Sequence, residues 1–140
     1  NLVIIGQGPD KELLDRKIKK LGVEAITFTG FIDETKKYEL MKRAKFFIFP
    51  SHEEGWGIAL AEALYCNCLA FCYELPHYRS IFGELPEYIK DGQSQQMAQS
   101  ILQNYTANVK TNQHGFLQRY DDKRVIKKVL KQINDSIGQD

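Results

Sequence analysis

The sequence has few cysteines and no long apolar run. Its 140 residues contain 3 cysteines, Cys66, Cys68 and Cys72, and an odd, closely spaced set does not fit a disulfide framework. A metal knuckle would need a C-x2-C pair, which is missing here, so we expect reduced thiols packed in a core. The apolar runs, such as "LVII" and "FFIF", have the length of strands and fall short of the roughly 18 residues that a membrane-spanning helix needs.

A strong charge of one sign is also missing. Lys and Arg number 19 and Asp and Glu 18, and this balance argues against a nucleic-acid partner. A local basic cluster does occur near the end of the chain, at Lys123, Arg124, Lys127, Lys128 and Lys131. A solvated helix face is the ordinary explanation of such a cluster, and peripheral contact with a membrane surface is the alternative. The length fits one domain, spanning residues 1–140.

Apolar runs and helical patterns alternate along the chain. The pattern predicts strands at 2–5, 25–29, 45–50 and 69–72. It predicts helices at about 11–21, 33–44, 57–65 and 93–105, and, within 74–92, a short helix, a turn and a short extended piece around 88–89. A loop at 106–115 and a last helix after 121 complete the prediction. Asp10 and Asp33 are predicted N-caps, and Gly22 a C-terminal stop. Such alternation predicts an α/β fold, a Rossmann-like open parallel sheet with helices on both faces. The run at 45–50 is apolar on both faces, which is typical of a central strand.

Ligands of open parallel sheets bind beyond the carboxyl ends of the strands. The turn at Gly6 and Gly8 lies at such an end, but it is not a dinucleotide fingerprint, because Lys11 stands where G-x-G-x-x-G needs glycine. This absence argues against a nicotinamide or flavin cofactor. A tight strand–helix connection is the more common explanation of two such glycines.

The stretch "PSHEEGWGIALAEAL", residues 50–64, is more informative. A predicted strand ends at Pro50 and a predicted helix starts near Gly57, so glycines leave the first amides of that helix uncovered for an anion. Glu54 precedes these amides, and Glu62 lies about one and a half turns into the helix. A phosphate flanked by two carboxylates that accept hydrogen bonds from hydroxyl groups suits a nucleotide sugar. Taken singly, Glu62 also fits an exposed helix position, and Glu53 and His52 fit solvated loop positions.

The segment "EGWGIALAE" resembles the E-x7-E motif of retaining glycosyltransferases with the GT-B fold, in the large group-4 family. The segments "LVIIGQGPDKELL", "ITFTGFID" and "PHYRSIF" follow the C-terminal domain of that family in the same order, over roughly residues 1–92. The resemblance implies that this chain is the half of a GT-B enzyme that binds the sugar donor. It implies transfer of a hexosyl group from a UDP-, GDP- or ADP-sugar with retention of configuration, in carbohydrate biosynthesis, with no metal ion or other cofactor.

The resemblance also implies roles for individual residues. Glu54 would be the catalytic residue, bonding hydroxyls of the transferred sugar near the reacting carbon, and Glu62 would bind the ribose. The backbone near Ile32 would contact the base. The donor-binding set implied is Gly8, Ile32, Gly55, Trp56, Gly57, Ile58 and Glu62.

The sequence departs from the family pattern in three ways. The Arg and Lys that relatives place on the diphosphate are not in this sequence, and neither is the N-terminal acceptor domain. We therefore expect further sequence upstream, including a first strand–helix segment, and expect the chain alone to be inactive. In the third departure, Asn67 stands where relatives have glycine at the helix exit, and asparagine tolerates the left-handed conformation next best.

The acceptor stays open among glycans, lipids and small molecules. The location implied is cytoplasmic, with the inner face of the membrane as an alternative. A non-catalytic nucleotide-sugar-binding domain and a nucleotide-sugar epimerase of the same fold are the alternative functions.

Overall fold

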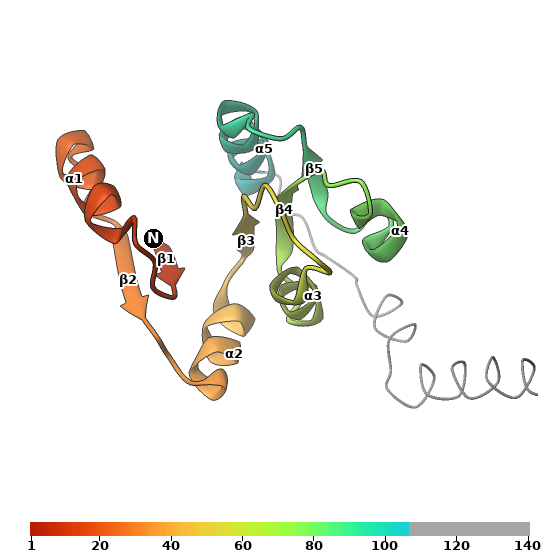
Figure 1. Cartoon of the computed structure of the whole chain (residues 1–140), viewed down its shortest axis with the longest axis horizontal. Coiled ribbons are helices and arrows are strands. Elements are labelled where there is room, and N and C mark those ends of the chain that lie inside the picture. The colour runs from red at the N-terminus through yellow and green to blue at the C-terminus, as the bar shows by residue number, and fades with distance from the viewer. Residues whose placement is uncertain (107–140) are drawn as a thin grey trace, which may run out of the picture. The chain divides into compact units, whose positions relative to one another are not determined.

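The computed structural model describes residues 1–106. The predicted loop at 106–115 and the last helix lie outside that range, apart from Thr106, which ends a helix. The chain divides into two compact units, residues 1–40 and the residues from Met41 onward (Figure 1). Each unit contains parallel strands and helices, as the alternating pattern predicts.

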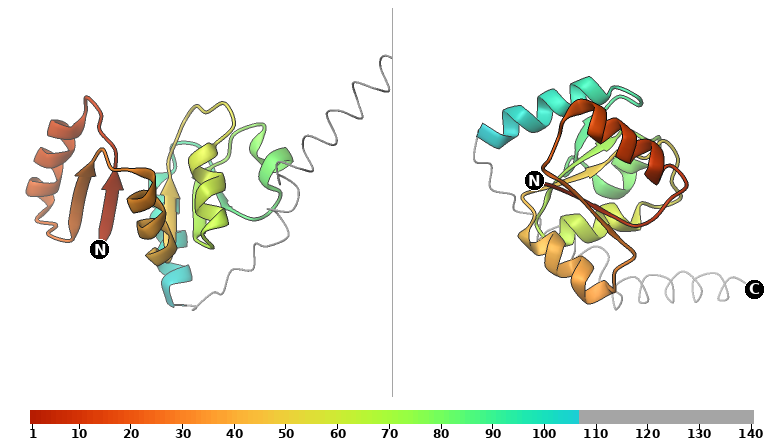
Figure 2. Two further views of the ribbon diagram at one scale, coloured as in Figure 1. Left: turned by 90° about the horizontal axis from the view of Figure 1, so that it is seen from below. Right: turned by 90° about the vertical axis from the view of Figure 1, so that its left-hand side faces the viewer.

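The first unit is built on two parallel strands, β1 (Leu2–Ile5) and β2 (Ile26–Gly30), joined through α1 (Lys11–Leu21). Figure 2 shows these strands side by side, with α1 alongside them. α1 ends at Gly22, whose φ of 63° is left-handed, as predicted. Asp10 does occupy the N-cap position, but its side chain makes no capping hydrogen bond, so that expectation was wrong.

Helix α2 (Glu34–Arg43) follows β2. Its predicted cap is confirmed, because Asp33 Oδ1 accepts a hydrogen bond of 2.8 Å from the amide of Lys36. Such a cap satisfies one of the amides that a helix leaves unpaired at its start.

The second unit contains three parallel strands in the order β3 (Phe46–Phe49), β4 (Leu69–Tyr73) and β5 (Glu87–Ile89). All five residues of β4 are buried, so β4 is the central strand of this sheet. β3 pairs with β4 and is the first strand in the order of this three-stranded sheet. Both of its faces are apolar and packed: Phe47 packs on one side of the sheet and Phe46 on the other.

Three helices complete the second unit: α3 (Ile58–Tyr65), α4 (Tyr78–Phe82) and α5 (Ser94–Thr106). Because side chains of a strand alternate between its two faces, β4 supplies two separate cores. Ala70 and Cys72 pack with residues of α3 and α4, among them Leu60, Leu64, Tyr78 and Phe82. Leu69, Phe71 and Tyr73 pack with Ile89 of β5 and Met97 of α5. The helices therefore cover both faces of this sheet.

The turn from α3 into β4 shows how the asparagine substitutes for glycine. Asn67 has a φ of 61°, and it is the one residue other than glycine with positive φ in the described part of the chain. The amide of Asn67 bonds to the carbonyl of Leu64, and that of Cys68 to Ala63, each at 3.0 Å. This left-handed residue ends α3, so the predicted tolerance of asparagine at this position is confirmed.

The three cysteines are buried thiols outside any disulfide, packed in the core as predicted. Burial raises the pKa of the Cys68 thiol from 9.0 to about 11 and that of Cys72 to about 12. Cys68 Sγ donates a hydrogen bond of 3.1 Å to the carbonyl oxygen of Met41. Both thiols are therefore protonated in the folded protein at neutral pH.

These shifts predict a loss of stability in alkali. The unfolded chain releases the Cys68 and Cys72 protons near pH 9, whereas the folded chain holds them to about pH 11 and 12. The contribution of these two thiols to the free energy of unfolding should be constant below pH 9 and then fall, by up to about 1.4 kcal/mol per pH unit for each thiol. Urea unfolding at pH 8.0 and 10.5 measures this fall, and Cys72→Ala should make it shallower. Equal stability at both pH values would contradict the prediction.

Candidate functional site

The candidate site lies where β3 runs into α3. The chain leaves β3 at Phe49, passes through the loop at 50–57 and enters α3 at Ile58. Ser51 Oγ donates a hydrogen bond of 3.0 Å to the carbonyl oxygen of Glu53 within this loop. Glu53 is exposed and Glu54 is half-buried, so the structure distinguishes these adjacent carboxylates.

Gly57 is the N-cap of α3 and occupies a position that only glycine fits. Its φ is 86°, and it is buried. A Cβ atom at this position would lie 3.2 Å from Tyr78 Oη and 3.3 Å from Phe82 Cζ. Both the backbone conformation and the close packing therefore require a residue without a side chain.

The first turn of α3 has the backbone character that suits an anion. No side chain caps this helix, and its first turn contains no acidic residue. The backbone hydrogen bonds of this helix begin at Gly57, whose carbonyl oxygen accepts a hydrogen bond of 3.0 Å from the amide of Ala61. The amides before Ala61 have no carbonyl of the preceding turn to pair with, and they carry the positive end of the helix dipole. An anion at this end would accept hydrogen bonds from these amides and would also be stabilised by the positive end of the helix dipole.

The other predicted donor-binding residues divide between the two units. Gly55 and Trp56 lie in the same loop, and the Trp56 ring meets Phe82 edge-on at 5.7 Å between ring centroids. Ile58 is exposed and Glu62 is half-buried on α3. Gly8 and Ile32 belong to the first unit, after β1 and β2 respectively. The second unit alone therefore holds Glu54, Glu62 and the open helix end.

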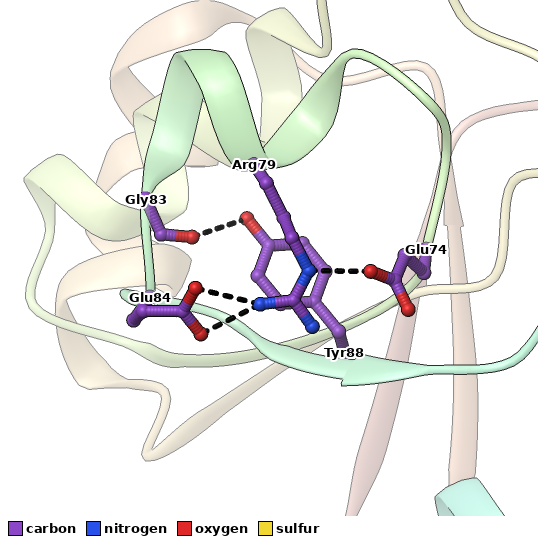
Figure 3. A network of polar contacts seen from close by, with 5 residues as sticks. All are labelled: Glu74, Arg79, Gly83, Glu84 and Tyr88. Atoms are coloured by element: carbon purple, nitrogen blue, oxygen red, sulfur yellow. Dashed lines mark hydrogen bonds and ion pairs between the residues drawn. The ribbon is translucent and has the colours of Figure 1, made fainter.

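Charged side chains of the segment between β4 and β5 form a cluster that sequence analysis did not predict. Arg79 pairs with Glu74 and, at 2.6 and 2.7 Å, with both oxygens of Glu84 (Figure 3). Its guanidinium lies 4.5 Å from the centroid of the Tyr88 ring, and hydrogen bonds from Arg79 to Glu74 and Glu84 raise the pKa of Arg79. Figure 3 also shows the Tyr88 hydroxyl, which donates to the carbonyl of Gly83 at 2.8 Å.

A pocket of about 380 Å³ adjoins this cluster. It is lined by Glu74, Leu75, Pro76, Arg79, Lys90 and Asp91. His52, which follows β3, places Nδ1 2.5 Å from Asp91 Oδ1 and packs its ring against Tyr73. The loops after β3, β4 and β5 thus meet at one edge of the sheet. His52 was expected to be a solvated loop residue; it is exposed, but it has a carboxylate partner 39 positions away that no local pattern reveals.

Tyr78 is a second residue that sequence analysis did not single out. Its side chain is fully buried, and its hydroxyl has no hydrogen-bond partner among residues 1–106. The segment "PHYRSIF" is part of the family resemblance, but only the packing behind Gly57 shows where this hydroxyl lies.

The described residues hold neither a cluster of metal-ion ligands nor a helix that could span a membrane. Residues 1–106 contain no group of three His, Cys, Asp or Glu side chains arranged to hold a metal ion. No helix in the same range has both the length and the apolar character to cross a membrane.

Comparison with known structures bears out the fold. The crystal structure of TarM matches with a TM-score of 0.77 at 19% identity, over 92% of this chain and 28% of that chain. The predicted Rossmann-like α/β architecture of a GT-B half is thereby confirmed.

Curated relatives are glycosyltransferases. The chain is 35% identical, over 85 residues, to the N-acetylgalactosamine-N,N'-diacetylbacillosaminyl-diphospho-undecaprenol 4-alpha-N-acetylgalactosaminyltransferase of Campylobacter jejuni, a match covering 59% of this chain and 23% of the relative. It is 35% identical over 63 residues to the O-antigen chain mannosyltransferase C of Escherichia coli, covering 44% of this chain and 17% of the relative. It is 31% identical over 94 residues to glycogen synthase of Mycobacterium tuberculosis, covering 66% of this chain and 21% of the relative. The chain therefore spans about a fifth of the length of these relatives.

The family model "Glycosyl transferases group 1" matches residues 1–114, which is most of the chain. The matched region includes the whole candidate site, from β3 through α3 to β5. The chain belongs to the group 1 glycosyl transferases.

Proposed function

We propose that this chain is the part of a longer glycosyltransferase that binds a nucleotide-sugar donor, and that the enzyme transfers a hexosyl group with retention of configuration. The observation behind the proposal is the start of α3: an uncapped helix end without a first-turn acid, with Glu54 ahead of it and Glu62 within it. Membership of the glycosyl transferase family supports the reaction class.

In the proposed complex the diphosphate lies at the first amides of α3. As the bond between the sugar carbon and the diphosphate breaks, the leaving oxygen takes the electron pair, and the amides and helix dipole stabilise the charge that develops there. The acceptor hydroxyl oxygen forms the new bond on the same face of the sugar, and its proton passes to the leaving diphosphate. Glu54 orients the sugar by accepting hydrogen bonds from its hydroxyls, and Glu62 does the same for the ribose.

Gly57 explains why the helix end stays accessible. Its missing side chain lets the loop pack against Tyr78 and Phe82, so the loop turns sharply into α3. Among the described residues, no atom lies within 4 Å of the Cβ position of Gly55, so the loop has room at this residue. Gly8, Ile32, Trp56 and Ile58 complete the proposed donor contacts.

The rest of the enzyme belongs to the same proposal. The relatives are about five times longer than their match to this chain, and we propose that an N-terminal acceptor domain and a cationic diphosphate contact lie elsewhere in the whole protein. The acceptor would be a glycan or a lipid-linked sugar. A cytoplasmic location agrees with three free cysteines, since oxidising compartments favour disulfides.

Calorimetric titration of the full-length protein with UDP, GDP, ADP and their sugars tests the proposal. We expect one nucleotide and its sugar to bind, and Glu62→Ala to weaken that binding, because the carboxylate's hydrogen bonds to ribose hydroxyls are lost. Hydrogen bonds to charged groups are worth about 1.5–3 kcal/mol, or roughly 10- to 150-fold in affinity.

Glu53→Ala is the matched control, since it removes the same charge from an exposed position of the neighbouring loop. It should leave the affinity within about twofold, as surface charges contribute little. Failure of every nucleotide to bind the full-length wild type would overturn the proposed function.

A further inference from the structure

The hydroxyl group of Tyr78 is an unusual feature of the core behind α3. The Tyr78 side chain is 0% exposed, and its Oη has no hydrogen-bond partner within residues 1–106. Its ring packs edge-on against Phe82, at 5.4 Å between centroids, and against His77, at 5.0 Å. A buried hydroxyl without a partner normally destabilises a protein, because it gives up water and gains nothing.

Packing alone does not require this hydroxyl. Phe82 belongs to the same buried cluster, so the cluster already accommodates a phenyl ring. A phenylalanine at position 78 would fill the same space without an unpaired polar group. The hydroxyl is therefore explained better by a partner that it acquires when the site is occupied.

The position of the hydroxyl indicates that partner. Oη lies against the N-cap of α3, 3.2 Å from where a Cβ of Gly57 would be, so it lies next to the loop that carries Glu54. Burial raises the pKa of Tyr78 to about 12, and the negative charge of Glu54 adds to that shift. The hydroxyl is thus protonated at neutral pH, and it is influenced by the negative charge of the Glu54 carboxylate.

The loop can bring the two groups together. Glu54 is half-buried, and Gly55 next to it has no atom within 4 Å of its Cβ position. Glycine rotates more freely than any other residue, so Gly55 can act as the point at which the backbone of Glu54 adjusts.

From this geometry we propose that Tyr78 is a positioning residue for Glu54: its O–H donates a hydrogen bond to the Glu54 carboxylate when the sugar donor is bound. The inference rests on the proposed function, in which Glu54 contacts the transferred sugar. One oxygen of the Glu54 carboxylate then accepts the hydrogen bond from Tyr78, and the other oxygen remains available to accept hydrogen bonds from the sugar hydroxyls.

A double-mutant cycle in the full-length protein tests this pairing. Tyr78→Phe, Glu54→Ala and the combined variant are compared with wild type for kcat, KM and melting temperature, using the nucleotide sugar found by titration. Tyr78→Phe should lower kcat by about tenfold or more, the range of a hydrogen bond to a charged group. It should leave the melting temperature unchanged or higher, since an unpaired buried hydroxyl is removed. In the Glu54→Ala background it should have no further effect on kcat.

Tyr88→Phe is the matched control. Its hydroxyl has a partner, the carbonyl of Gly83 at 2.8 Å, so its loss should lower the melting temperature and leave kcat unchanged. An equal loss of kcat on Tyr78→Phe with and without Glu54 would overturn the inference, as would an unchanged kcat in the wild-type background. If donor binding is intact, either result overturns this inference alone. If no donor binds the wild type, the proposed function fails and the inference fails with it.

Discussion

Replacement of Gly57 by alanine should destabilise the protein by about 2–5 kcal/mol. The left-handed φ of 86° costs about 1–2 kcal/mol for a residue with a side chain. The new methyl group would also press on Tyr78 Oη at 3.2 Å and Phe82 Cζ at 3.3 Å, and overpacking of a core costs about 1–3 kcal/mol. Urea unfolding monitored by circular dichroism measures the change.

Gly55→Ala provides the control for this substitution. Gly55 is exposed, has no positive φ and has nothing within 4 Å of its Cβ position. Alanine there should change the free energy of unfolding by less than about 0.5 kcal/mol. Similar losses at both positions would show that any side chain in the loop is harmful, and that the packing behind Gly57 is not the cause.

Glu54→Ala in the full-length protein should reduce glycosyl transfer by about 100-fold or more. If Glu54 holds the sugar at its reacting carbon, its loss removes both hydrogen bonds and orientation, and misplacement of the reacting groups alone has effects of about this size. Since Glu54 is only half-buried and precedes the helix, the melting temperature should change little. Initial rates at saturating nucleotide sugar measure the effect.

Glu53→Ala separates a specific role of Glu54 from the charge of the loop. The two carboxylates are adjacent, and Glu53 is exposed. Its removal should leave the rate within about twofold, because exposed charges act weakly through water. Equal losses from the two substitutions would rule out the assigned role of Glu54 and indicate a general electrostatic effect.

Local backbone conformation was predictable from sequence at positions where the identity of a single residue determines it. Gly22 ends α1 and Asn67 ends α3 because few residues adopt a left-handed conformation, and Asp33 caps α2 because its short side chain reaches the helix amides. The loop at 50–57 was found for the same reason: glycine is informative wherever the backbone or a neighbour forbids a side chain.

Long-range contacts were not predictable in this way. The order β3-β4-β5 depends on which strands pair, and an apolar run such as "FFIF" does not specify which strand becomes its neighbour. The pairing of His52 with Asp91 and the meeting of Tyr78 with Gly57 join residues 39 and 21 positions apart, respectively. The failed cap at Asp10 is a smaller case, since the side chain has the right identity and position but makes no bond.

The contact of Gly57 with Tyr78 and Phe82 links thermostability to the proposed activity. Tyr78 and Phe82 belong to the core behind α3 and also pack on the turn into that helix, so a repacking mutation at position 82 would move the proposed donor-binding loop as well. Directed evolution toward higher melting temperature would therefore meet a trade-off here, as it does wherever a site and a core share residues. Substitutions at 57, 78 and 82 should be epistatic, because residues in contact do not act additively. A stabilising library would do better to vary the core around Phe71 and Met97, on the opposite face of β4.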